Sequence, residues 1–186
     1  MKRVIVVLVL VMSASLFGQE TASPKWKFGF GVNFIDNSAL ESKQFLKTNN
    51  WNAIDFISLF SADYAVGQNL AIGGTVSMNE LSKDNNQNGG MITKDVLYVA
   101  FDANARYTFD QHLVDVAWFD ASVVGDAGLF MVDGKGNHTL NGGLALDFWF
   151  SKTTGIRLQT LGKFALEEDL LGNNHIQHSA QFVVKF

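Results

Sequence analysis

The feature that most constrains this chain is an alternation of apolar and polar residues with a period of two. Its last segment, residues 175–186, shows the pattern. One face carries Ile176, His178, Ala180, Phe182, Val184 and Phe186, and the other carries His175, Gln177, Ser179, Gln181, Val183 and Lys185. Such a pattern predicts a β-strand with one largely apolar face. In water this face would cover a core, whereas in a bilayer it would contact lipid.

The alternation recurs along the chain, so we expect eight strands in total. The other seven segments are residues 26–35, 54–64, 70–79, 96–109, 118–131, 140–150 and 156–165. Most have the length that a tilted strand needs to cross a bilayer, about 9–11 residues. An even number of strands allows the sheet to close with both chain ends on one side. No helical periodicity is long enough to predict a helix-rich core.

The charged residues test this assignment, because the faces were assigned from the apolar residues. Every charge within these segments is expected on the polar face: Lys27, Asp55, Asp63, Asp102, Arg106, Asp120, Asp126, Asp147, Arg157, Lys163 and Lys185. A Lys or Arg facing the bilayer midplane costs about 2–4 kcal/mol, so lipid would enforce this segregation. A soluble ligand-binding barrel would instead place the apolar face inside. The sequence therefore predicts an all-β fold, an eight-stranded antiparallel up-and-down transmembrane β-barrel.

The connections and the aromatic residues support the same fold. Links 65–69, 110–117 and 151–155 are short or modest and lie on the side of the amino terminus, whereas links 36–53, 80–95, 132–139 and 166–174 are longer and more polar. Outer-membrane barrels have short periplasmic turns and longer external loops. An interfacial aromatic belt is expected on the short-turn side: Trp26, Tyr64, Tyr107, Phe109, Trp118, Trp149, Phe150 and Phe186.

The first segment of the chain has the layout of a secretory signal. Lys2 and Arg3 precede an apolar run at 4–12, which is followed by small residues. We therefore expect residues 1–19 to be a signal peptide and residues 20–186 to form one exported barrel domain. The chain has no cysteine, and its formal net charge of −4 argues against nucleic acid as a partner.

Three stretches and the final residue carry a family resemblance. Residues 141–150 (NGGLALDFWF), 155–160 (GIRLQT) and 175–179 (HIQHS), together with the final Phe186, resemble the OmpA-like eight-stranded outer-membrane barrels of Bacteroidota, a porin family. The resemblance implies a location in the bacterial outer membrane, contact with outer-membrane lipids, and insertion by the barrel-assembly machinery. Many such proteins continue into a peptidoglycan-binding domain. This sequence ends at the barrel, so a role in tethering the cell wall is not carried over.

Two histidines and one loop are the candidates for chemistry. His175 and His178 lie three residues apart on one strand and point to opposite faces, so they cannot share a metal ion, and we expect them at the water interface. His178 and the adjacent Ser179 also face opposite ways, which argues against the nucleophile and base of a lipid A deacylase. The loop between Asp84 and Asp95 has the spacing of a calcium loop but few carboxylates, and an ordinary exposed turn remains the alternative. No catalytic, cofactor-binding or metal residue is assigned, and no cofactor or enzyme activity is predicted.

The predicted function follows from the narrow interior of an eight-stranded barrel, which side chains fill. The leading hypothesis is a small structural outer-membrane protein that contributes to envelope integrity and presents external loops for surface contacts. The alternatives are a narrow porin or gated pore and a lipid A-modifying enzyme. Phe45, Leu46 and Trp51 could form a contact surface in the first long loop or could pack on the barrel rim.

Overall fold

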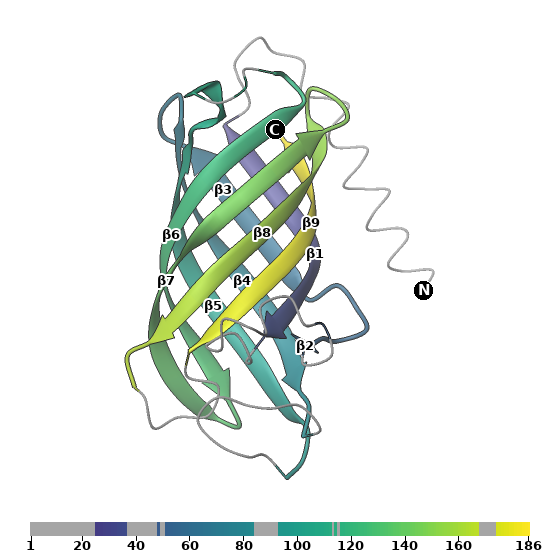
Figure 1. Cartoon of the computed structure of the whole chain (residues 1–186), viewed down its shortest axis with the longest axis vertical. Helices are drawn as coiled ribbons and strands as arrows, with labels where there is room; N and C mark the ends of the chain where they lie inside the picture. The colour runs from purple at the N-terminus through teal and green to yellow at the C-terminus, as the bar shows by residue number, and fades with distance from the viewer. Residues whose placement is uncertain are drawn as a thin grey trace.

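The structure of the protein is a computed structural model that describes residues 25–36, 48, 51–83, 93–112, 114, 116–167 and 174–186, without the side chain of residue 112. Its eight long strands form a single closed sheet with steeply tilted strands (Figure 1). They are β1 (Trp26–Asp36), β3 (Leu59–Ala65), β4 (Leu70–Leu81), β5 (Val96–Thr108), β6 (Phe119–Val132), β7 (Lys135–Trp149), β8 (Thr154–Ala165) and β9 (His175–Lys185). A two-residue strand, β2 (Trp51–Asn52), extends the sheet beside the end of β1.

Each long strand pairs antiparallel with its neighbour in the chain, and β1 pairs with β9 to close the barrel. The closing register runs from Lys27 opposite Lys185 to Asp36 opposite Ile176. Closure leaves no free edge along these strands, as a bilayer requires. The predicted fold, an all-β, eight-stranded antiparallel up-and-down barrel, is confirmed. Within the described residues, no helix is long and apolar enough to cross a membrane.

The two faces of the sheet have the predicted sidedness. On β7, Leu144 is 54% exposed on the outside, and its neighbour Ala145 is 1% exposed on the inside. On β9, Phe182 belongs to the outer face, while Val183 is fully buried inside. The outside of the barrel is therefore an apolar girdle, and the charged residues in the middle of the strands line the lumen, whereas Glu80 near the end of β4 is exposed.

One predicted strand is shorter than expected. Residues 54–58 precede β3, and Asp55 is exposed in a bend, so its predicted place on the lumen face is wrong. The backbone N–H of Ser58 donates to the carbonyl of Gly31 (2.9 Å), and β3 begins at the next residue. The pairing of β1 with β3 therefore ends at Gly31, and the last two residues of β1, Ile35 and Asp36, pair with β2 instead. The alternation at 54–58 therefore belongs to the segment that joins β2 to β3.

One predicted long loop is a tight turn. Residues 132–139 contain the two-residue link Asp133-Gly134, and β7 begins at Lys135. Both link residues have positive φ, 49° and 77°, as a type I′ hairpin turn requires. The expectation of a longer link here is wrong, because the Asp-Gly pair lets the two strands pair almost to their tips.

The links between β3 and β4, β5 and β6, and β7 and β8 lie at the end of the barrel that carries Trp26 and Phe186, at the top of Figure 1. This is the short-turn end. The opposite end is the loop end, and the Asp133-Gly134 turn lies there. The link between β5 and β6 includes the short 3-10 helix η2 (Asp110–His112). The predicted signal peptide 1–19 and most of the predicted long loops at 36–53, 80–95 and 166–174 lie outside the described residues.

Candidate functional site

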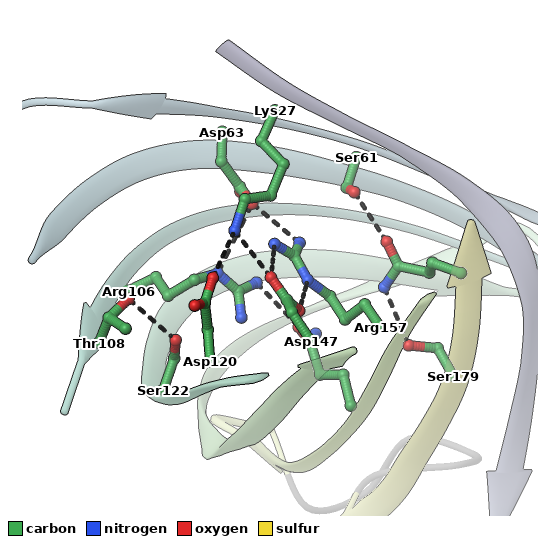
Figure 2. A network of polar contacts seen from close by, with 12 residues as sticks. Lys27, Ser61, Asp63, Arg106, Thr108, Asp120, Ser122, Asp147, Arg157 and Ser179 are labelled. Carbon is green, nitrogen blue, oxygen red and sulfur yellow. Dashed lines mark hydrogen bonds and ion pairs between the residues drawn. The ribbon is translucent and has the colours of Figure 1, made fainter. Parts of the chain in front are cut away.

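The centre of the lumen is an ion cluster around Arg157 of β8, which is fully buried. Its Nε donates to Oδ1 of Asp147 (2.8 Å) and its NH2 to Oδ2 of the same carboxylate (3.2 Å). Its NH1 donates to Oδ2 of Asp63 (2.8 Å), which lies across the barrel on β3 (Figure 2). Paired strands place Asp147 directly opposite Arg157, whereas Asp63 reaches it only because the sheet closes. One guanidinium thus joins two walls of the barrel.

Two more cations extend this cluster. The Nε of Arg106 lies 3.5 Å from Oδ2 of Asp63, and its NH2 donates to Oε1 of Gln159 (2.9 Å). The ammonium of Lys27 donates to Oδ2 of Asp147 (2.7 Å). These charges are sequestered from bulk water, where leaving one of them without its counter-ion is costly. The cluster therefore links β1, β3, β5, β7 and β8 through side chains.

The short-turn end of the lumen is occupied by Trp149, which is 7% exposed. Its indole N–H donates to Oδ2 of Asp120 (2.8 Å). The ammonium of Lys185 lies 3.6 Å from the centre of the Trp149 ring, and that of Lys27 lies 4.9 Å from it. The predicted place of Trp149 in an interfacial belt is wrong, because its position on β7 puts it in phase with the inward Asp147. The other predicted belt aromatics at this end include the exposed Trp26, Tyr107, Trp118, Phe150 and Phe186.

A second ion cluster lies closer to the loop end. The Lys163 ammonium donates to Oδ2 of Asp102 (2.6 Å), and both side chains are buried. The amide of Asn141 donates to Oδ1 of Asp102 (3.1 Å) and also to Asp126. These residues come from β5, β6, β7 and β8, so this cluster braces the opposite side of the barrel wall from β1 and β3.

Amide and hydroxyl groups fill the lumen near the loop ends of β1, β4 and β9. Asn33 donates through Nδ2 to Oγ of Ser58 (2.9 Å) and accepts at Oδ1 from Asn79 (3.0 Å) and Gln177 (3.2 Å). Gln177 also donates to Oγ of Ser77 (2.9 Å). These neutral side chains donate to and accept from one another, so they fill this part of the lumen without adding net charge.

An apolar cluster lies inside the barrel near the loop end. Tyr98 and Phe130 stack with ring centres 5.4 Å apart, and the Tyr98 hydroxyl lies 3.0 Å from Nε2 of His175. The cluster consists of Ile35, Leu81, Val96, Tyr98, Ala100, Phe130 and Val132. This cluster was not predicted from the sequence. The available signal was the unbroken apolar run at 96–101, which makes both faces of β5 apolar at this end.

The two histidines do point to opposite faces, as predicted. His175 lies inside, 4% exposed, and its ring meets Phe130 edge-on. His178 lies on the outer side, where its Nδ1 is 3.0 Å from the hydroxyl of Thr160 and its ring stacks on Trp51 at 4.7 Å. The expectation that both lie at the water interface is wrong, because each is covered by aromatic rings. Ser179 faces the lumen and accepts from Gln181 (3.1 Å), so it does not form a pair with His178.

The first long loop contributes Trp51 to the barrel rim. Besides stacking on His178, its ring lies 5.5 Å from that of Phe34 on β1. Trp51 therefore packs on the barrel rim, which was one of the two alternatives predicted for this loop; Phe45 and Leu46 lie outside the described residues.

Most of the calcium-like loop between Asp84 and Asp95 also lies outside the described residues. Among the described residues, no group of three or more His, Asp or Glu side chains is arranged to hold a metal ion.

Comparison with known proteins agrees with this architecture. No protein-family model and no curated protein matches the sequence. The solved structure of neisserial surface protein A superposes with a TM-score of 0.59 at 13% identity, covering 87% of this chain and 96% of that one. The N-terminal β-barrel domain of Pseudomonas aeruginosa OprF gives a TM-score of 0.53 at 10% identity, covering 88% of this chain and 98% of that one. The chain has an outer-membrane β-barrel fold. This fold, together with the apolar girdle, is that of a protein of the bacterial outer membrane.

Proposed function

We propose that this outer-membrane β-barrel is a structural protein that contributes to envelope integrity and presents its loops at the cell surface for contacts. The observation that carries the proposal is the filling of the lumen. Arg157 and its partners cross the interior in one half, and the Tyr98 and Phe130 cluster occupies the loop end. A barrel filled in this way supports a membrane-embedded scaffold better than a nutrient channel.

Planar-bilayer recording tests the filled lumen. The native protein is expected to give no steady, ion-selective openings, because an ion would have to displace both buried ion pairs and packed aromatic rings. The positive control combines Tyr98→Ala, Phe130→Ala and Arg157→Ala. It removes the aromatic rings from the loop half of the lumen and the central guanidinium from the other half, so it is expected to conduct. Steady openings of the native protein would favour the narrow pore and contradict the scaffold.

A deletion strain tests the role in the envelope. We expect increased sensitivity to detergents and to large antibiotics, restored by expression of the native chain. The Arg157→Ala variant is expected to restore less, in proportion to its lower level in the membrane. Normal sensitivity of the deletion strain would contradict a contribution to envelope integrity.

The proposed role is non-enzymatic and places this chain beside the OmpA-like barrels of Bacteroidota that its motifs resemble. Its partners would be outer-membrane lipids and, during insertion, the barrel-assembly machinery. The separation of His178 and Ser179 to opposite faces supports the absence of lipid A modification. Mass spectrometry of lipid A with and without the protein is expected to show the same species, and a change in acylation would overturn this part of the proposal.

A further inference from the structure

A cavity of about 160 Å³ opens at the short-turn end of the barrel. It is bounded by the start of β1, the turn between β3 and β4, and the ends of β5 and β9. A cavity needs roughly 10–15 Å³ to hold one water molecule, so this one has room for a larger group. Since short turns face the periplasm in outer-membrane barrels, the cavity opens toward the periplasmic surface of the membrane.

The lining of this cavity is strongly cationic. Lys25, Lys27, Arg106 and Lys185 line it, whereas Asp63 is its one acidic lining residue. Counting the nearby Arg157, Asp120, Asp126 and Asp147 as well, cations outnumber carboxylates by five to four. The excess positive charge at this end comes from Lys25 at the rim.

The cations form a graded path into the barrel. Lys25 is exposed at the rim, and the side chains of Lys27 and Lys185 are 19% and 26% exposed. Arg106 is at the inner wall, 3% exposed. An anion entering from the mouth would pass from solvated ammonium groups to a sequestered guanidinium.

Arg106 has unused donor capacity. Its NH2 donates to Gln159, but its Nε and NH1 make no hydrogen bond to any residue that the structure describes. The Nε lies 3.5 Å from Asp63 as an ion pair. A guanidinium offers five N–H donors, and a buried donor without an acceptor is costly. An acceptor with several oxygens and a negative charge would satisfy it.

We propose that this cavity is a binding site for a phosphate group. Arg106 donates to the phosphate oxygens from the inner wall, and Lys27, Lys185 and Lys25 neutralise its charge from the mouth. Asp63 stays paired with Arg157 and Arg106, which limits its repulsion of the anion. The phosphate belongs either to a lipid headgroup of the periplasmic leaflet or to a soluble phosphate compound, since both present the same oxygens.

Isothermal titration with inorganic phosphate tests the site. The native barrel is refolded in octyl glucoside, a detergent without phosphate, and compared with Lys25→Gln and Lys185→Gln. The matched control is Lys152→Gln, which removes an exposed cation from the turn between β7 and β8 at the same end of the barrel. Arg106→Lys keeps the charge but removes the guanidinium, and its folding is checked by heat-modifiable gel migration.

We expect saturable binding by the native protein that weakens about fivefold in Lys25→Gln and in Lys185→Gln, as for the loss of one solvated charge about 4 Å away. Lys152→Gln is expected to bind like the native protein. Absence of saturable binding, or equal loss in Lys152→Gln, would overturn the proposal. Folded Arg106→Lys is expected to bind phosphate more weakly than the native protein, and native affinity in this variant would overturn the role of the guanidinium. If Arg106→Lys does not fold, Lys25→Gln and Lys185→Gln still decide.

A second titration identifies the source of the phosphate group. The same protein is placed in phospholipid nanodiscs. A weaker affinity for inorganic phosphate than in octyl glucoside means that a lipid headgroup competes for the site. An unchanged affinity assigns the site to soluble phosphate compounds.

Discussion

Removal of the Arg157 guanidinium should destabilise the barrel strongly. Arg157→Met keeps much of the side-chain length but removes three hydrogen bonds to two buried carboxylates. Breaking a buried ion pair by removing one partner typically costs 3–5 kcal/mol. Asp147 keeps Lys27, and Asp63 keeps Arg106, so we expect the lower end of this range, about 3 kcal/mol.

The assay is reversible urea unfolding of the barrel in phospholipid vesicles, with the folded fraction read from heat-modifiable gel migration. The control is Lys94→Met, which breaks the exposed pair with Asp133, 3.5 Å apart. Exposed pairs contribute about 0–1 kcal/mol, so this control is expected to unfold close to the native midpoint.

A double-mutant cycle separates the ion pair from general packing. Arg157→Met combined with Asp147→Asn is expected to lose less free energy of unfolding than the sum of the single changes, with a coupling of about 1–3 kcal/mol. If Arg157→Met unfolds at the same urea concentration as Lys94→Met, the lumen cluster does not stabilise the fold and the reasoning is wrong.

Three further predictions concern the wall of the barrel, each measured by the same unfolding assay. Gly143→Ala should destabilise the fold by about 1–3 kcal/mol, because its new Cβ would press on the backbone carbonyl of Thr160. The matched control Gly125→Ala should be neutral, because there is open space around its Cβ. Equal effects of the two changes would contradict this packing. Gly134→Ala should cost about 1–2 kcal/mol, because φ is +77° there, and a neutral result would refute the tight turn. Leu144→Arg should cost about 2–4 kcal/mol in vesicles, and full tolerance would place this side chain in water.

The strands could be predicted from the sequence because lipid and lumen impose opposite demands on successive residues. Leu144 and Ala145, or Phe182 and Val183, needed only their position in the alternation to be assigned a face. The alternation misled at Asp55, because an alternating segment there serves a connection rather than the wall. It also missed the Asp133-Gly134 turn, although this residue pair is a known signal for a type I′ hairpin.

The contents of the lumen were harder to predict than its wall. Sequence alternation places Arg157 and Asp63 inside, but their contact depends on closure of the sheet and on the stagger of strands distant in sequence. Tyr98 and Phe130 are apolar on the lumen side, so the rule that sorts polar residues inward could not find them. Trp149 is a different case. The alternation places it inward with Asp147, and its aromatic ring alone suggested the interfacial belt; its indole N–H donates to Asp120.

The most direct test of the sidedness is a nitroxide scan along β7 in phospholipid vesicles. The chain has no cysteine, so single cysteines for spin labelling can be introduced without altering the background. Labels at Leu140, Leu144 and Leu146 should show high collision rates with lipid-soluble oxygen and low rates with a water-soluble nickel complex, whereas a label at Ala145 should show low rates with both. High nickel accessibility at the leucines, or the loss of the period of two, would contradict a barrel whose apolar face meets lipid.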